Sequence, residues 1–283
     1  MESSATNNLN AKETFKKCGA CSNTFAHILN REFDNPNELA EKALNPLAGG
    51  ILNKGHQCGM IWGAILATGA EAYRNHKDKD KALAVAITAA QHIIESFEKR
   101  SGSVNCKEIL GYSISNFIGI ARLMVTSLIV GMDNNKCFNL AEEWAPEAIK
   151  SANEGLELKT IKTVEKPYSC ASEVVKKMGG TDEEALMVAG FAGGLGLSGN
   201  ACGALSAAIW MKTLQWCREN PQKLPPYFNN KMANRILNSF NETTDGELNC
   251  KKITGKEFKN YSDHFEYTRQ GGCKTLIETL GKS

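Results

Sequence analysis

The sequence lacks the charge pattern and the leader that would point to nucleic acid or to export. Its 33 basic and 31 acidic residues leave a formal charge of +2 at pH 7, without a long run of one sign. Such a balance gives no electrostatic footprint for nucleic acid. The first residues, Met1 to Lys17, contain no apolar signal core, so we expect a cytoplasmic protein.

It also lacks an apolar run of the length that a membrane span needs. The longest run, Phe117 to Met132, is short for a bilayer and carries Arg122, so we expect a buried helix there and no membrane span. Nowhere does an alternation of apolar and polar residues with a period of two persist, which leaves helices as the expected elements. The glycine loops lack the Lys-Ser or Lys-Thr ending of a phosphate-binding loop, which argues against nucleotide binding.

Cysteine, in contrast, is abundant, with ten residues in a chain of 283. Structural disulfides are disfavoured inside the cell. Thiols kept in such number are better explained as metal ligands or as redox groups. The function should therefore be sought in the cysteines.

Most of the cysteines belong to an internal duplication with a constant offset of 144 positions. A constant offset that persists over this distance, and that is marked by glycine and cysteine, indicates a tandem repeat rather than chance. The shared residues are Ala48-Gly49-Gly50, Gly55, Cys58-Gly59 and Asn105-Cys106-Lys107 in the first copy, and Ala192-Gly193-Gly194, Gly199, Cys202-Gly203 and Asn249-Cys250-Lys251 in the second.

The duplication divides the chain into two modules. We assign residues 11–150 to repeat 1 and residues 168–283 to repeat 2, joined by a polar linker over residues 151–167. Each repeat is long enough to bury a core of its own. Because duplicated modules often descend from a homodimer, we expect an all-α fold in which two homologous helical modules pack about a pseudo-twofold axis.

Local signals predict where several helices begin and end. The helical spacing of apolar residues predicts one helix from near Asn10 through Ile28. Asn35 and Pro36 predict the cap and first turn of the next helix, and Thr181 predicts a capping box at its counterpart in repeat 2. Both of these helices should end at the Gly-Gly pairs. A long apolar helix should then start at each Cys-Gly pair.

Aligning the two copies matches four cysteines in each. A thiol at the N-terminus of a helix meets free backbone N–H groups and the positive end of the helix dipole, and both stabilise the thiolate. Four thiolates that converge from different helices suit an iron–sulfur cluster or zinc. The matched residues are Cys21, Cys58, Cys106 and Cys137 in repeat 1, and Cys170, Cys202, Cys250 and Cys273 in repeat 2.

This arrangement resembles the CGCAxxGCC family of redox-active proteins, which also contains the split-Soret cytochromes c. The resemblance rests on a first cysteine, a glycine loop, a Cys-Gly-Ala-x-x-Gly motif and two further single cysteines, and it covers both halves of the chain. Repeat 1 departs from the motif at Met60 and repeat 2 departs from it at Ala207. No Cys-x-x-Cys-His occurs, so covalent attachment of haem is not implied.

The resemblance implies a redox protein that binds one or more iron–sulfur clusters through the eight matched cysteines. It would exchange electrons with a redox partner protein or reduce a small-molecule substrate; if it is an enzyme, it is an oxidoreductase. Two alternatives stay open: a metal-free thiol/disulfide oxidoreductase, and a zinc-stabilised or metal-free helical scaffold. The type of cluster, the electron partner and assembly into a homo-oligomer stay open as well.

The remaining cysteines and the histidines carry weaker signals. Cys217 lies on an apolar helix and is expected in the core. Cys18 could replace Cys21 as a ligand or pair with it in a Cys-x-x-Cys. His56, or Asn200 at the same position of repeat 2, could hydrogen-bond a site sulfur, although a surface loop position is the simpler interpretation. The histidines without a counterpart in the other repeat are His27, His92 and His264.

Overall fold

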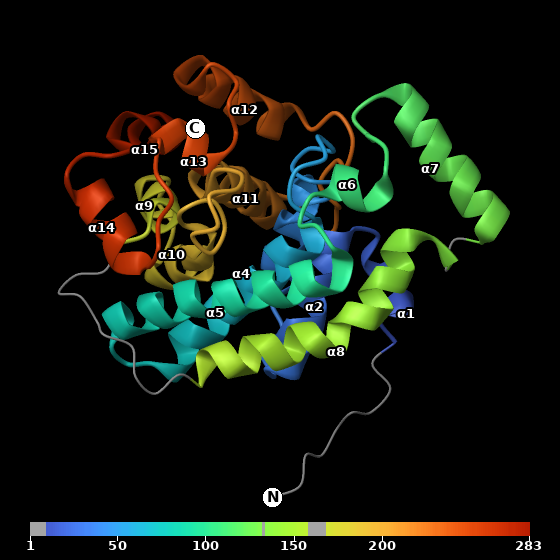
Figure 1. Ribbon diagram of the computed structural model, residues 1–283, viewed down its shortest axis with the longest axis horizontal. Coiled ribbons are helices and arrows are strands. Elements are labelled where there is room, and N and C mark those ends of the chain that lie inside the picture. The colour runs from blue at the N-terminus through green and yellow to red at the C-terminus, as the bar shows by residue number, and fades with distance from the viewer. Residues whose placement is uncertain (1–9, 132–133, 158–167) are drawn as a thin grey trace, which may run out of the picture.

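The computed structural model describes residues 10–131, 134–157 and 168–283. Within these ranges the chain is all-α, and its extended pairing is limited to two isolated bridges, Gln57 with Asn105 and Ala201 with Asn249. In Figure 1 repeat 1, in blue to green, forms the lower and right-hand part, and repeat 2, in yellow to red, lies above it and to the left. The all-α fold expected from the sequence is confirmed.

Elements α2 to α8 of repeat 1 correspond in order to α9 to α15 of repeat 2. The elements of repeat 1 are α1 (Ala11–Cys18), α2 (Cys21–Glu32), α3 (Glu38–Ala43), the 3-10 turn η1 (Asn45–Leu47), α4 (Gly59–Asn75), α5 (Lys79–Ser101), α6 (Cys106–Leu110), α7 (Phe117–Val130) and α8 (Lys136–Leu156). Those of repeat 2 are α9 (Cys170–Lys177), α10 (Asp182–Met187), η3 (Ala189–Phe191), α11 (Gly203–Glu219), α12 (Lys231–Thr244), α13 (Cys250–Thr254), α14 (Tyr261–Arg269) and α15 (Lys274–Leu280).

The two repeats pack against each other about a pseudo-twofold axis. Helix α3 packs on α11, and its counterpart α10 packs on α4. The backbone N–H of Ala201 donates to Oε1 of Gln57 at 3.0 Å, and these two residues hold the same position in the two repeats. Trp62 of repeat 1 meets Phe191 of repeat 2 edge to face, with ring centroids 4.8 Å apart. Both rings are fully buried, so the repeats share one hydrophobic core.

The single helix predicted from Asn10 through Ile28 is wrong. Gly19 adopts a left-handed φ of 75° and ends α1, and α2 begins two residues later at Cys21. Glycine can close the last turn of a helix in this conformation because it has no Cβ. The break makes Cys21 the first residue of a helix rather than a residue in the middle of one.

The predicted starts of the other helices are mostly confirmed. Thr181 caps α10 with a full capping box, in which its hydroxyl accepts from the Glu184 N–H at 3.2 Å. In repeat 1 the cap is Asn37 rather than Asn35. Both helices end before the Gly-Gly pairs, because a 3-10 turn follows each of them. The long helices α4 and α11 begin at the Cys-Gly pairs as predicted.

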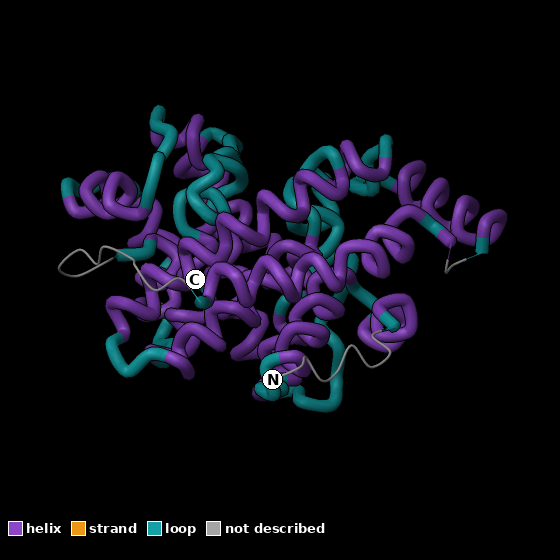
Figure 2. The backbone as a smooth tube through the Cα atoms, turned by 60° about the horizontal axis from the view of Figure 1, so that its bottom comes forward, coloured by secondary structure: helices purple, strands orange, loops and turns teal. Residues whose placement is uncertain are grey.

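Helix α7 does not have the buried position that its apolar sequence predicts. Phe117 and Leu128 are each 83% exposed. The helix stands out from one end of the body in both views (Figures 1 and 2). The prediction of a buried helix rested on its apolar residues alone, and these do not show whether another element packs on the helix. None of the helices that the structure describes is long and apolar enough to cross a membrane.

Helix α8 continues to Leu156, into the range 151–167 that the sequence predicts as a linker. Its last turn packs closely on α5, since a Cβ added to Gly155 would lie 2.5 Å from the Cα of Ala89. Residues 158–167 of the predicted linker lie outside the described residues.

Candidate functional site

The glycine loop that precedes the second cysteine has the same backbone hydrogen bonds in both repeats. In repeat 1 the Gly55 N–H donates to the Gly49 carbonyl at 3.1 Å, and in repeat 2 the Gly199 N–H donates to the Gly193 carbonyl at 3.0 Å. Gly49 and Gly193 have φ values of 64° and 62°. A residue with a Cβ is strained in this left-handed region, so the loop requires glycine there.

A short antiparallel bridge then brings the second and third cysteines together. The Cys58 N–H donates to the Val104 carbonyl at 2.8 Å, and the Cys106 N–H donates to the His56 carbonyl at 2.7 Å. Two cysteines that are far apart in the sequence are thereby fixed side by side through their own backbones. The counterparts in repeat 2 are Cys202 to Leu248 at 2.8 Å and Cys250 to Asn200 at 2.6 Å.

Each of the eight matched cysteines lies at the cap or in the first turn of a helix. The N–H groups at a helix start have no partner within the helix and are free to donate to a sulfur. The Cys21 sulfur accepts hydrogen bonds from Ser22 and Gly59 at helix starts and from Gly49 in the glycine loop, in each case from the backbone N–H. The cysteines are Cys21 (α2), Cys58 (α4), Cys106 (α6) and Cys137 (α8), which we call site 1, and Cys170 (α9), Cys202 (α11), Cys250 (α13) and Cys273 (α15), which we call site 2.

In site 1 one thiol stabilises its neighbour as a thiolate. The Cys58 S–H donates to the Cys21 sulfur, which outweighs burial and lowers the pKa of Cys21 to about 7. The same hydrogen bond, together with burial and the nearby thiols, raises the pKa of Cys58 well above its usual range. The reduced, metal-free site therefore shares one thiolate charge near neutral pH, and Cys58 keeps its proton.

A tyrosine that comes from repeat 2 lies close to the thiols of site 1. Burial raises the pKa of Cys137 to about 12 and that of Cys106 further, and the charge of Cys21 adds to both. Tyr227 is half-buried, and burial together with all four thiols of site 1 raises its pKa as well. Its backbone carbonyl accepts from Nδ2 of Asn53, in the glycine loop of repeat 1, at 3.3 Å. Repeat 2 thus helps to enclose the site of repeat 1.

The four cysteines of site 2 line a single small cavity. Burial raises the pKa of every thiol in it: to about 12 for Cys202, and further for Cys170 and Cys250. The pKa of Cys273 is also raised by burial, although the Tyr267 hydroxyl donates to its sulfur and acts in the opposite direction. Site 2 thus differs from site 1, where the pKa of one thiol is lowered.

Site 2 also contains an imidazole. His264 lines the cysteine cavity and is 2% exposed. Burial lowers its pKa to about 4, so the ring is neutral at physiological pH. The ring of Phe258 stands edge to face against it, with centroids 4.9 Å apart. Lining residues of site 2 that differ in kind from repeat 1 include Thr254, Phe258, His264 and Tyr267, whose counterparts are Leu110, Ile114, Ile120 and Leu123.

The structure groups the matched cysteines by repeat. The thiols that act electrostatically on one another are Cys21, Cys58, Cys106 and Cys137 in one set, and Cys170, Cys202, Cys250 and Cys273 in the other. We see no mixing of the two sets among these contacts. The order of the eight cysteines along the chain therefore matches their grouping in space.

Cys18 and Cys217 stand apart from both sites. Cys18 lines a surface groove with His27 and Glu41, and burial raises its pKa to about 11. The charged groups that act most strongly on it are Glu41, Arg31 and Lys17. Cys217 is fully buried in the core, as predicted. His56 contributes its backbone carbonyl to the bridge, not its ring to a sulfur.

Sequence reasoning missed Tyr227, His264 and Tyr267. The signal for His264 and Tyr267 was present, because both lie at positions where repeat 1 has an aliphatic residue. A polar residue that replaces an aliphatic one near repeated cysteines marks a difference between the two sites. Tyr227 had no such signal, since it reaches site 1 only through the packing of one repeat on the other.

The side chains as they stand do not form a closed coordination shell. No three His, Cys, Asp or Glu residues within the described ranges are disposed to hold a metal ion. The donor set nevertheless fits a thiolate-bound cluster in kind, because each site offers four thiols and backbone N–H donors. Glycine leaves room at the sulfurs: a Cβ on Gly59 would lie 2.5 Å from the Cys21 sulfur, and one on Gly194 would lie 2.7 Å from Cβ of Cys250.

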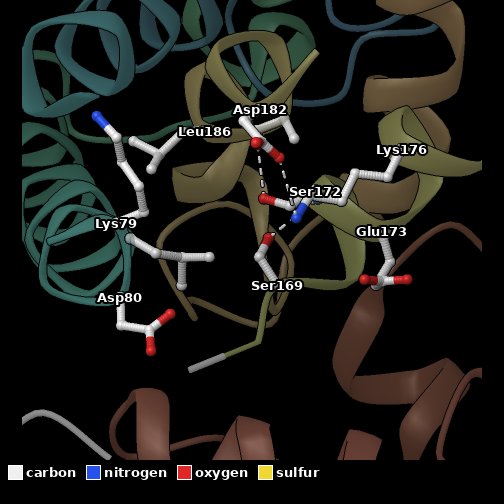
Figure 3. Close-up of a pocket in the computed structure, with 10 residues that line it drawn as sticks. Lys79, Asp80, Ser169, Ser172, Glu173, Lys176, Asp182 and Leu186 are labelled. Carbon is white, nitrogen blue, oxygen red and sulfur yellow. Dashed lines mark hydrogen bonds and ion pairs between the residues drawn. The ribbon is translucent and has the colours of Figure 1, made fainter. Parts of the chain in front are cut away.

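A polar groove lies away from both cysteine sites, between α5 and the helices α9 and α10 (Figure 3). Lys79 comes from α5, and Lys176 comes from α9. The hydroxyls of Ser169 and Ser172 donate to backbone carbonyls at 3.2 and 2.6 Å, so their hydrogen-bonding capacity is used locally. The described residues that line the groove include neither cysteine nor histidine.

Comparison with known families agrees with the geometry. The family model described as "Putative redox-active protein (C_GCAxxG_C_C)" matches the chain twice, over residues 19–149 and 168–282. The chain belongs to this family. The two matches make it a tandem duplication of the family's module, as the offset of 144 positions indicates. No match was found among curated proteins or among solved structures. The family supports a redox role for the cysteines.

Proposed function

We propose that each repeat binds one iron–sulfur cluster through its four cysteines and that the chain works as an electron-transfer protein. The strongest support is an arrangement that occurs in both repeats: four cysteines, each at the start of a helix, lie around one glycine loop. Iron–sulfur clusters are held by cysteine thiolates, and hydrogen bonds to sulfur tune their potentials. Both features are present in each repeat.

The raised pKa values of the cysteines are compatible with this role. Burial disfavours the charged thiolate, and neighbouring thiolates would also repel one another, so most of these thiols hold their protons in the metal-free protein. Bound iron supplies positive charge that reverses this balance, and the thiols lose their protons when they become ligands. Loading should therefore release protons and should weaken as the pH falls.

The surroundings of each site would control access to it. Tyr227 over site 1, and Phe258 with Tyr267 over site 2, limit the entry of water to the sulfurs. Site 1 lies beneath a half-buried tyrosine, and Cys273 of site 2 is partly exposed, so each site has one edge near the surface. Electrons would pass through these edges to a redox partner protein or to a small acceptor. Any turnover would make the chain an oxidoreductase.

Chemical analysis of the whole chain tests the proposal. We expect protein purified without oxygen, or reconstituted with ferrous iron and sulfide under reducing conditions, to contain both elements and to show visible absorption that bleaches on reduction. A colourless chain without iron after reconstitution would overturn it. A chain that takes up zinc but no iron and sulfide would favour a zinc-stabilised scaffold.

One contact favours a second candidate function, a metal-free thiol/disulfide oxidoreductase that uses Cys21 and Cys58. The Cys21 thiolate would attack a substrate disulfide, which breaks the S–S bond and forms a mixed disulfide. Cys58 would then lose its proton to the departing thiolate and attack the Cys21 sulfur, which releases the reduced substrate as two thiols. The result is a Cys21–Cys58 disulfide, formed from two thiols that already share a hydrogen bond.

The disulfide proposal has its own test. Metal-free protein would be oxidised, digested and mapped, and its reduction of a model disulfide would be measured. We expect Cys21→Ser to abolish the reduction and Cys170→Ser, the matched change in repeat 2, to leave it intact. An equal effect of both changes, or the absence of a Cys21–Cys58 disulfide, would exclude this mechanism.

A further inference from the structure

His264 lines the cysteine cavity of site 2, and one of its ring nitrogens has no hydrogen-bond partner in the described part of the chain. Its Nδ1 is buried, and it has no hydrogen-bond partner among the described residues. The side chain is 2% exposed, so bulk water does not compensate. A buried polar atom left without a partner costs about 1–3 kcal/mol. A bound ligand that accepts this nitrogen as a partner would offset that cost.

The imidazole has one backbone acceptor close to it. The carbonyl of Tyr168 acts on the ring in the direction that raises its pKa, as an acceptor from a ring N–H does. Nδ1 has no partner within the ranges that the structure describes, so a proton on Nε2 would leave the lone pair on Nδ1. Metal-ligating histidines almost always donate their other ring N–H to a carbonyl or carboxylate. This tautomer of His264 is the one that a ligand requires.

The ring is also held in place. Phe258 packs edge to face against it. On another side lies the glycine loop, where a Cβ on Gly193 would come within 3.5 Å of Cδ2 of the imidazole. Tyr267, one helical turn after His264 on α14, lines the same cavity. The imidazole thus has a defined orientation before any ligand arrives, which lowers the cost of binding one.

Repeat 1 has no equivalent group. The residue 144 positions before His264 is Ile120, and the one before Tyr267 is Leu123. Helix α7, which carries them, projects from the body, whereas α14 contributes to the wall of site 2. An aliphatic side chain cannot ligate a metal, so repeat 1 offers no ligand at these two positions.

We propose that Nδ1 of His264 is a ligand of the metal centre in site 2, together with cysteines of that site. This inference rests on the proposed function and refines it: site 1 would keep its four sulfur ligands, whereas in site 2 the imidazole would take the place of one of the four cysteines. A neutral imidazole in place of a thiolate lowers the negative charge of the centre, and this raises its reduction potential. Electrons that enter at site 1 would therefore move to site 2.

The test uses the full chain labelled with ¹⁵N-histidine and carrying Cys58→Ser, so that only the centre of site 2 contributes. Pulsed electron paramagnetic resonance of the reduced protein should show a strongly coupled ¹⁵N nucleus. In Cys58→Ser with His264→Ile, which installs the repeat 1 residue, the coupling should vanish and the potential of the centre should fall. The same label in a Cys202→Ser chain, where only site 1 remains, is the matched control and should show no strong coupling.

Each outcome bears on the proposal. A reduced centre in site 2 without strongly coupled nitrogen, or a coupling that survives His264→Ile, would overturn it. The first measurement needs no change at His264, so a misfolded His264→Ile chain does not rescue the idea. If the unmodified chain binds no iron after reconstitution, the proposed function fails and this ligand assignment fails with it. Iron with sulfur ligands only would leave the proposed function standing and reject His264.

Discussion

Sites 1 and 2 share a backbone and differ in what surrounds it. The N–H of the second cysteine donates at 2.8 Å in both repeats, to the carbonyl of Val104 in repeat 1 and of Leu248 in repeat 2. Around this common frame, site 1 has a Cys21–Cys58 hydrogen bond and a tyrosine from the other repeat, and site 2 has a buried histidine and a tyrosine from its own α14. The two repeats therefore keep the same backbone arrangement around the thiols, and the side chains next to the thiols differ.

The divergence extends to the helices behind the sites. In repeat 1, α2 lies so close to α4 that a Cβ on Gly63 would come within 2.1 Å of the Ser22 carbonyl oxygen. Repeat 2 has Ala207 at that position, so α9 cannot approach α11 in the same way. The longer spacing between the first and second cysteines of repeat 1 comes mainly from α2, which has 12 residues where α9 has 8.

The largest expected effect is a loss of bound iron and sulfide when one of the two sites is removed. Cys58→Ser and Cys202→Ser should each cost about half of the bound iron and sulfide, because each removes a ligand of one cluster only. Iron and sulfide per chain would be measured after anaerobic reconstitution, and circular dichroism would confirm that the helices persist. If either change alone removed all of the iron, the two repeats would share a single assembly.

Much of this comparison is foreseeable from the sequence, because the duplicated glycines and cysteines are local and repeated. The Cys-Gly helix starts and the Thr181 capping box follow from neighbouring residues alone. The break at Gly19 was missed because the apolar spacing runs through it. The exposure of α7 and the arrival of Tyr227 at site 1 depend on how one element packs on another, and a pattern along the chain does not encode that directly.

Helix packing behind site 1 should be less tolerant than behind site 2. Gly63→Ala should destabilise the chain by about 1–3 kcal/mol, because the added methyl meets the backbone of α2. The reverse change in repeat 2, Ala207→Gly, should cost only about 1 kcal/mol through lower helix propensity. Urea unfolding of the metal-free protein measures both. A smaller loss for Gly63→Ala than for Ala207→Gly would contradict the difference in packing.

Acid should lower the free energy of unfolding of the metal-free protein, because His264 in site 2 is buried in its neutral form. Burial lowers the pKa of His264 from 6.5 to about 4, so its contribution to stability is fully present above pH 6.5 and is lost as the pH falls towards 4. Between pH 7 and pH 5 this amounts to about 2 kcal/mol. His264→Ile should remove that part of the pH dependence of unfolding, measured by urea at each pH. An unchanged slope would show that the histidine is not buried as described.

The most direct test of two non-equivalent clusters is the Mössbauer spectrum of the chain reconstituted with ⁵⁷Fe. We expect the spectrum of the unmodified protein to equal the sum of the spectra of Cys58→Ser and Cys202→Ser, and we expect those two spectra to differ from each other. Identical spectra for the two variants would contradict the difference between the sites. The absence of any iron spectrum from the unmodified chain would contradict the clusters themselves.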